Sequence, residues 1–162
     1  MPGAPGAAAP EVLRMYLALL HTHNLTRWLV LVTALVAIVW ALQARLSGRS
    51  FEKRHRIANL VFVSSMDLQL LLGFALYFVS PLVQAGLANM SAAMADAALR
   101  FFVVEHATYM IVAVVLAHVG SVMVRRAKND AGKHGRAILW FGLSLAVVLA
   151  GIPWNRALFP GL

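Results

Sequence analysis

The chain contains no cysteine among its 162 residues. Disulfide bonds, thiolate-bound zinc, iron–sulfur clusters and covalently attached c-type haem are therefore excluded, because each of them needs cysteine sulfur. The sequence also lacks the glycine-rich phosphate-binding motifs, the nucleophile elbow and the paired-histidine zinc motif of metalloproteases. A bound metal would have to use histidine, carboxylate or methionine, or sit in a macrocycle.

Charged residues are scarce as well. Only 12% of the residues are Asp, Glu, Lys or Arg, whereas 61% are apolar and the mean hydropathy is +0.77. A soluble core of this size cannot bury so much apolar surface, so the composition predicts an integral membrane protein. The length predicts a single domain.

Four apolar stretches are long enough to cross a hydrocarbon core, which needs roughly 20 helical residues. They lie at about 21–44, 57–80, 101–124 and 136–154. We therefore predict an all-α fold, a four-transmembrane-helix up-down bundle over residues 21–156. Residues 1–20 form a flexible or interfacial segment, whose second half either lies in the interface or extends the first helix, and residues 157–162 form a tail. The start, MPGAPGAAAP, has no signal-peptide pattern.

Basic residues mark one side of the membrane. Five of the fourteen Lys and Arg lie between the first and second spans and five between the third and fourth, whereas the 81–99 loop has none. By the positive-inside rule both basic loops are cytoplasmic and both termini lie on the outer side. The sequence thus predicts a multi-pass protein of the bacterial cytoplasmic membrane, and its net charge of +8 reflects orientation rather than nucleic-acid binding. His55 and His134 belong to these loops and are predicted to be solvated.

Two histidines lie at nearly the same depth near the outer face. His106 is 19 residues from Arg125, and His23 is 22 residues from Arg45. At 1.5 Å per residue their depths differ by only about 4–5 Å. The first and third spans are diagonal in an up-down bundle, which leaves room for a flat macrocycle between their side chains. The pair therefore predicts one bis-histidine b-type haem.

Charged residues near this depth suit a haem. Arg27 lies one turn from His23 on the same helix face, Arg100 begins the third span, and Arg156 follows the fourth. These arginines would bind the two propionates, while Glu105 could orient a ligating imidazole through its second nitrogen. The alternative is a cofactor-free ion-pair cluster of Arg27, Arg100 and Glu105 at the headgroup level.

His118 raises the question of a second haem. It lies about 120° around the helix from His106, and no other histidine shares its depth, so one haem is favoured over two. Ser64 and Ser144 lie at its level and could bond a neutral imidazole. Asp67 lies near the bilayer centre, where a carboxylate suggests function. His118 is either a satisfied bundle histidine or, with Asp67, part of a proton or quinone site.

The triplet at 21–23 also permits a copper or zinc site. His21 and His23 could supply two ligands, and Glu105 with His106 two more. Residues two apart point about 200° apart on a helix, however, which disfavours binding of one ion by both. His21 remains the alternative to His23 as a metal ligand, and His118 the alternative to His106.

Several strings resemble a family of small bacterial four-span membrane proteins described as cytochrome b-like: LLHTHNLTRW, DLQLLLGFALYFVSP, RFFVVEH, KHGRAI and IPW. The resemblance runs from about Leu20 onward. It implies a haem, and its pattern falls on five positions of this sequence: His23, Arg27, Arg100, Glu105 and His106. The chain lacks the four paired histidines of two-haem cytochromes, which argues against electron transfer across the membrane.

These features predict an electron-transfer component, or a haem-bearing subunit of a larger redox complex, rather than a stand-alone enzyme. Its partner would be a quinone or a redox protein, and the chain could form homo-oligomers. Two other classes remain open. One is a cofactor-free accessory or assembly protein, and the other is a metal-handling or small-solute transporter.

Overall fold

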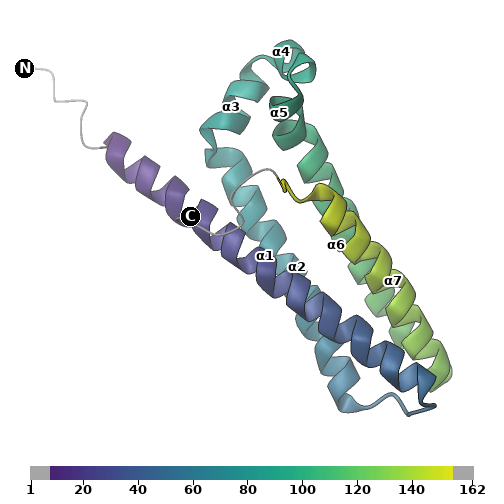
Figure 1. Cartoon of the computed structure of the whole chain (residues 1–162). Helices are drawn as coiled ribbons and strands as arrows, with labels where there is room; N and C mark the ends of the chain where they lie inside the picture. Colours follow the sequence, from purple (N-terminus) through teal and green to yellow (C-terminus); the bar gives the residue numbers. More distant parts are fainter. Residues whose placement is uncertain (1–7, 155–162) are drawn as a thin grey trace, which may run out of the picture.

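The computed structural model describes residues 8–154, with side chains from residue 11 onward. No strand occurs in this part of the chain, which is almost entirely helical (Figure 1). The elements in chain order are α1 (Ala8–Leu46), α2 (Lys53–Val79), α3 (Pro81–Ala88), α4 (Met90–Ala95), α5 (Ala97–Arg100), a π-helical turn (Phe101–Glu105), α6 (His106–Arg125) and α7 (Asp130–Gly151).

The four predicted spans are confirmed as long apolar helices. Segments long and apolar enough to cross a membrane are Glu11–Leu46, Lys53–Val79, Ala97–Arg125 and Asp130–Gly151. At 1.5 Å per residue, the 39 residues of α1 extend about 58 Å, nearly twice the hydrocarbon thickness. The first part of α1 therefore projects past the other long helices (Figure 1). Of the two alternatives for residues 11–20, the structure has the helical extension.

The four long helices form a ring of neighbours. Helix α1 packs on α2 and α7, and α6 packs on the same two helices, so α1 and α6 are diagonal. Residues 47–52 and 126–129 connect the helices at one end, which we call the basic end, and α3–α5 lie at the opposite end (Figure 1). Helices α1 and α6 run in the same direction, as the up-down prediction requires.

Small side chains allow the helices to approach one another. Ala34, Ala37 and Ala41 form a buried row along α1, and such small residues are typical of helix contacts in membranes. The centre of the bundle is filled by Phe62 and Phe141, whose rings meet edge to face at 5.1 Å. Larger apolar side chains are exposed on the outside, where the acyl chains of a bilayer would contact them.

The segment between the second and third spans folds into three short helices. Each begins with a capping side chain, because Ser80, Asn89 and Asp96 accept a hydrogen bond from a backbone N–H of the following turn. Helix α5 then continues through the π-helical turn into α6, where the N–H of His106 donates to the carbonyl of Phe101. The third span is thus one continuous helical rod with a local change of pitch directly before His106.

Candidate cofactor site

His23 of α1 and His106 of α6 meet at the end of the bundle opposite the basic end. Their ring centroids are 6.3 Å apart and the rings are inclined by 73°. A metal ion bound at about 2 Å to one nitrogen of each ring, from opposite sides, holds two centroids about 6 Å apart. The two diagonal helices thus bring together the pair that the depth argument selected, at a separation compatible with a shared iron.

A backbone carbonyl fixes the orientation of His106. Its Nδ1 lies 2.7 Å from the carbonyl oxygen of Gly151, in the last turn of α7. Because a carbonyl only accepts, Nδ1 carries the proton, and the Nε2 of a neutral ring keeps its lone pair. Histidines that bind metals commonly donate their other ring N–H to a carbonyl in this way. Gly151 therefore has the orienting role that the sequence analysis offered to Glu105.

Glycine is required at position 151 for this contact. A Cβ atom there would lie 2.5 Å from Cε of Met110 and 2.7 Å from Cβ of Tyr109. The end of α7 approaches α6 closely only because residue 151 has no side chain, and this approach brings its carbonyl to the imidazole.

The π-helical turn Phe101–Glu105 sets the rotation at which α6 begins. Turns of this kind occur often at functional sites, since the inserted residue changes the direction of the side chains that follow. The hydroxyl of Tyr77 in α2 donates to the carbonyl of Val103 within the turn, at 2.8 Å. The turn is therefore bonded to the neighbouring helix directly before His106.

Gln69 of α2 holds His23. Its Nε2 lies 3.2 Å from Nε2 of His23 and donates to the backbone carbonyl of His23 at 3.0 Å, while the Thr26 hydroxyl donates to its Oε1. An amide nitrogen only donates, so Nε2 of His23 accepts. Nδ1 of His23 is buried and makes no hydrogen bond within residues 8–154. The His23 ring packs closely on Gly73, where a Cβ would lie 3.3 Å from its Cε1.

Gln69 and Thr26 were missed as site residues. The amide of Gln69 could have indicated the site, because an uncharged polar side chain inside a membrane span costs free energy unless it forms a hydrogen bond. Only His106 presents a free ligand atom for an iron between the two rings: its Nε2 makes no hydrogen bond in the described part of the chain, whereas Nδ1 of His23 carries the ring proton while Nε2 accepts from Gln69. Binding through Nε2 of His23 would require the Gln69 amide to turn away.

The arginines at the end of the bundle opposite the basic end differ in their surroundings. Arg27 is buried, with its guanidinium 5.8 Å from the Trp28 ring and within electrostatic range of both histidines. Arg100 instead pairs with Glu105 at 2.7 Å, and both side chains are partly exposed. Arg156 lies outside the described residues. The structure thus forms one ion pair of the alternative cluster, between Arg100 and Glu105, while the guanidinium of Arg27 lies near the imidazoles.

The four-ligand copper or zinc arrangement does not form. His21 is exposed on α1, and Glu105 is bonded to Arg100 rather than turned toward His106. Across residues 8–154 there is no group of three or more His, Asp or Glu side chains that could hold a metal ion. The α-helical geometry around residues 21–23 places the two histidines of the triplet on different faces, as their spacing indicated.

His118 pairs with Asp67, one of the partners predicted for it, and not with Ser144. Its Nε2 lies 2.8 Å from Oδ1 of Asp67, and both side chains are about half exposed on the outside of the bundle. Ser144 is fully buried and donates to the carbonyl of Ala113, so it is not available to His118. Ser64 is exposed one turn before Asp67. The prediction that these four residues form one group is wrong for Ser144, which faces the bundle interior.

The prediction that His55 and His134 are solvated is wrong. They are 2% and 0% exposed, and their rings meet at 4.9 Å with Phe51 packed against both. The backbone N–H of Glu52 donates to Nδ1 of His55, and Nε2 of His134 donates to the carbonyl of Arg49. Residues 47–52 fold back over the helix ends, and this covers histidines whose sequence neighbours are mostly polar.

The two histidine pairs lie at opposite ends of the bundle and on opposite diagonals. His55 and His134 belong to α2 and α7, whereas His23 and His106 belong to α1 and α6. A centroid separation of 4.9 Å is shorter than the roughly 6 Å that two rings need on opposite sides of one iron. The geometry at the basic end is that of a packed aromatic cluster.

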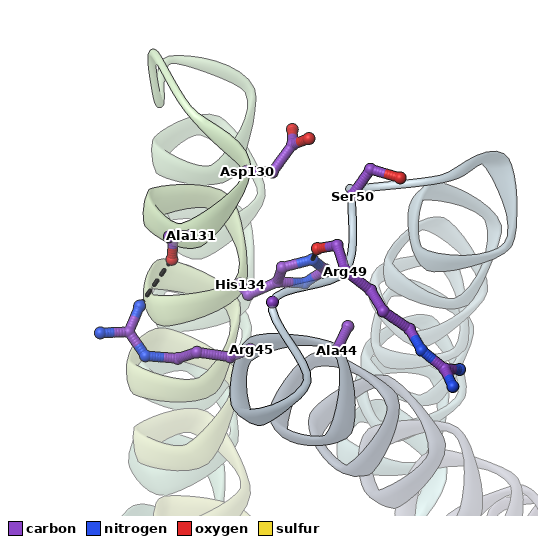
Figure 2. A pocket seen from close by; sticks show the side chains of 8 residues that line it. Ala44, Arg45, Arg49, Ser50, Asp130, Ala131 and His134 are labelled. Carbon is purple, nitrogen blue, oxygen red and sulfur yellow. Dashed lines mark hydrogen bonds between the residues drawn. The ribbon is translucent and has the colours of Figure 1, made fainter.

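A cavity of about 210 Å³ lies at the basic end, between the end of α1 and the start of α7. Arg45, Arg49 and His134 are among the residues that line it, and Arg45 donates to the carbonyl of Ala131 at 2.6 Å. Figure 2 shows the two guanidinium groups pointing away from each other. The contact of Arg45 joins the end of α1 to the start of α7.

Comparison with models of protein families, with curated proteins and with solved structures finds no match.

Proposed function

We propose that this membrane protein binds one b-type haem between His23 and His106 and serves as an electron-transfer component, or as the haem-bearing subunit of a redox complex. The observation that carries the proposal is the meeting of two imidazoles from diagonal helices at 6.3 Å, with the second nitrogen of His106 anchored on a carbonyl. The resemblance to cytochrome b-like proteins supports the same pair. We place the protein in the bacterial cytoplasmic membrane, with the site toward the outer face.

A haem supplies one-electron chemistry when bound, and the chain's residues position it. His23 and His106 would provide the two nitrogen ligands, and the Gly151 carbonyl keeps the proton of His106 on Nδ1. Arg27 places a buried cation next to the pair, which favours a carboxylate such as a propionate. A quinone or a redox protein would then exchange electrons with the site.

One observation favours a cofactor-free accessory protein as the second candidate. The Gln69 amide already bonds His23, and Arg100 already pairs with Glu105, so much of the polar cluster is satisfied by the chain itself. In that case the same side chains serve only to fix the packing of α1, α2 and α6.

Absorption of the purified protein separates the two candidates. The protein expressed with haem available and isolated in detergent should be red, with about one haem per chain in a pyridine haemochrome assay. His23→Ala and His106→Ala should each abolish or severely weaken haem retention, because each removes an iron ligand. His21→Ala is the matched control, since it removes an exposed histidine two residues away and should leave the spectrum unchanged.

Other haem contents and other responses of the variants would contradict the proposal in different ways. A haem content near zero would support the accessory protein, and a content near two would make the aromatic cluster at the basic end a second site. Loss of haem in His21→Ala with retention in His23→Ala would contradict the described rotation of α1. His55→Ala and His134→Ala are unsuitable controls, because both rings are buried.

A further inference from the structure

Asp67 of α2 and His118 of α6 form a bonded pair on the outer surface of the bundle. The contact joins Oδ1 and Nε2 at 2.8 Å, and 46% and 51% of the two side chains are exposed. Neither side chain makes another hydrogen bond within the part of the chain that the structure describes. About half of each side chain is thus exposed on the outside of the bundle, with one ring nitrogen and one carboxyl oxygen not used in the contact.

The pair lies at the depth of the acyl chains. Asp67 is 11 residues from Arg56 and His118 is 7 residues from Arg125, which puts the contact about 10–16 Å inside the level of these cations. A hydrocarbon core is about 30 Å thick. The exposed neighbours on the same face are apolar apart from Ser64, and they include Leu71 and Val115. Lipid tails offer no partner to polar atoms, so leaving the pair against lipid is costly.

The protonation states of Asp67 and His118 determine which polar atoms the pair can offer to a partner. Without a net charge it is either an imidazolium with a carboxylate or a neutral imidazole with a protonated carboxyl. In both forms Nδ1 of His118 carries a proton to donate, and Oδ2 of Asp67 accepts. The two remaining forms carry a net charge, negative when both groups are deprotonated and positive when both are protonated, and a net charge is costly inside a membrane. The surface therefore offers one donor and one acceptor side by side.

We propose that this face of α2 and α6 is where two copies of the chain associate about a two-fold axis. A surface with one donor and one acceptor is complementary to itself, because rotation by a half turn places Nδ1–H of each His118 on Oδ2 of the other copy's Asp67. The apolar neighbours pack equally well on lipid or protein, so the polar contacts decide the association. The cavity lined by Arg45 and His134 and the smaller one lined by Trp40 and His55 both lie at the basic end of the bundle, away from this pair.

The absence of cysteine allows a direct test. Ser64→Cys places a thiol within one turn of the proposed contact, and Leu139→Cys places one at an exposed position of α7, the helix diagonal to α2. The full chain carrying either change is reconstituted at high lipid-to-protein ratio and oxidised. Disulfide-linked dimer is expected from Ser64→Cys and only at background level from Leu139→Cys.

Substitutions of Asp67 and His118 test whether their hydrogen bonds hold the two copies together. Asp67→Leu with His118→Leu removes every polar atom while suiting the helices to lipid, and should reduce the Ser64→Cys dimer about tenfold or more. Asp67→His with His118→Asp exchanges donor and acceptor and should restore it. Light scattering in detergent should give a dimer for the unmodified chain and a monomer for the double leucine variant, with unchanged helical circular dichroism in both.

Three results would overturn the proposal. Equal cross-linking at positions 64 and 139 would show that the face is not an interface between copies. A dimer that survives in the double leucine variant would place the interface elsewhere. A monomer that binds a quinone analogue, and loses it in the double leucine variant, would assign the pair to that ligand. None of these readouts depends on haem.

Discussion

His106 and His134 are both enclosed by the fold near helix ends, and each donates one ring N–H to a backbone carbonyl. What differs is the other side of the ring. Within residues 8–154 neither Nε2 of His106 nor Nδ1 of His134 makes a hydrogen bond, but the ring of His106 faces His23 at 6.3 Å, whereas the ring of His134 packs against Phe51 and His55 at 5.2 and 4.9 Å. The same residue type thus acts as a candidate ligand at one end and as a packing side chain at the other.

This contrast predicts the effect of removing His134. The ring is fully buried, so His134→Ala should leave a cavity, lose the bond to Arg49 and lower the free energy of unfolding by about 2–4 kcal/mol. Haem content per folded chain should not change. Unfolding by denaturant, with the exposed His21→Ala as control, measures the difference. Equal stability of the two variants would contradict the buried cluster.

At the scale of elements, the end of α7 and the start of α6 form the site together. Neither helix contains it, since the donor comes from the first residue after a π-helical turn and the acceptor from the last residue of α7. Their separation is fixed by the glycine at position 151, because a Cβ there would overlap Met110 and Tyr109.

A methyl group at this contact should therefore disturb the site. Gly151→Ala should force the end of α7 away from α6, cost about 1–3 kcal/mol of stability and weaken haem retention by releasing Nδ1 of His106. Gly142→Ala is the matched control in the same helix, because a Cβ there meets nothing within 4 Å. It should be neutral or slightly stabilising. Haem titration and thermal unfolding of both variants test this prediction. Identical behaviour of Gly151→Ala and Gly142→Ala would refute it.

At the scale of the whole molecule, the basic residues are concentrated at one end of the bundle. Ten of the fourteen Lys and Arg lie between the first and second or the third and fourth spans, whereas the three short helices α3–α5 at the other end contain one basic residue, Arg100. Such asymmetry determines how a bundle is inserted.

Reporter fusions test the resulting topology. Fusions at residues 50 and 130 should report the cytoplasm, and a fusion at residue 90 should report the outer side. An external signal at residue 50 would reverse the orientation and would move the histidine pair to the cytoplasmic face.

The four spans, the diagonal placement of α1 and α6 and the shared depth of His23 and His106 could all be predicted from the sequence. These properties follow from hydropathy and from a fixed rise per residue, which are local. Packing between distant segments decided the rest. The return of residues 47–52 over His55 and His134, the bond from Gln69 to His23, the carbonyl of Gly151 at His106 and the exposure of Asp67 with His118 all depend on how each helix is rotated about its axis. That rotation is set by contacts among alanines, glycines and aromatic rings far apart in the chain, and no single span contains it.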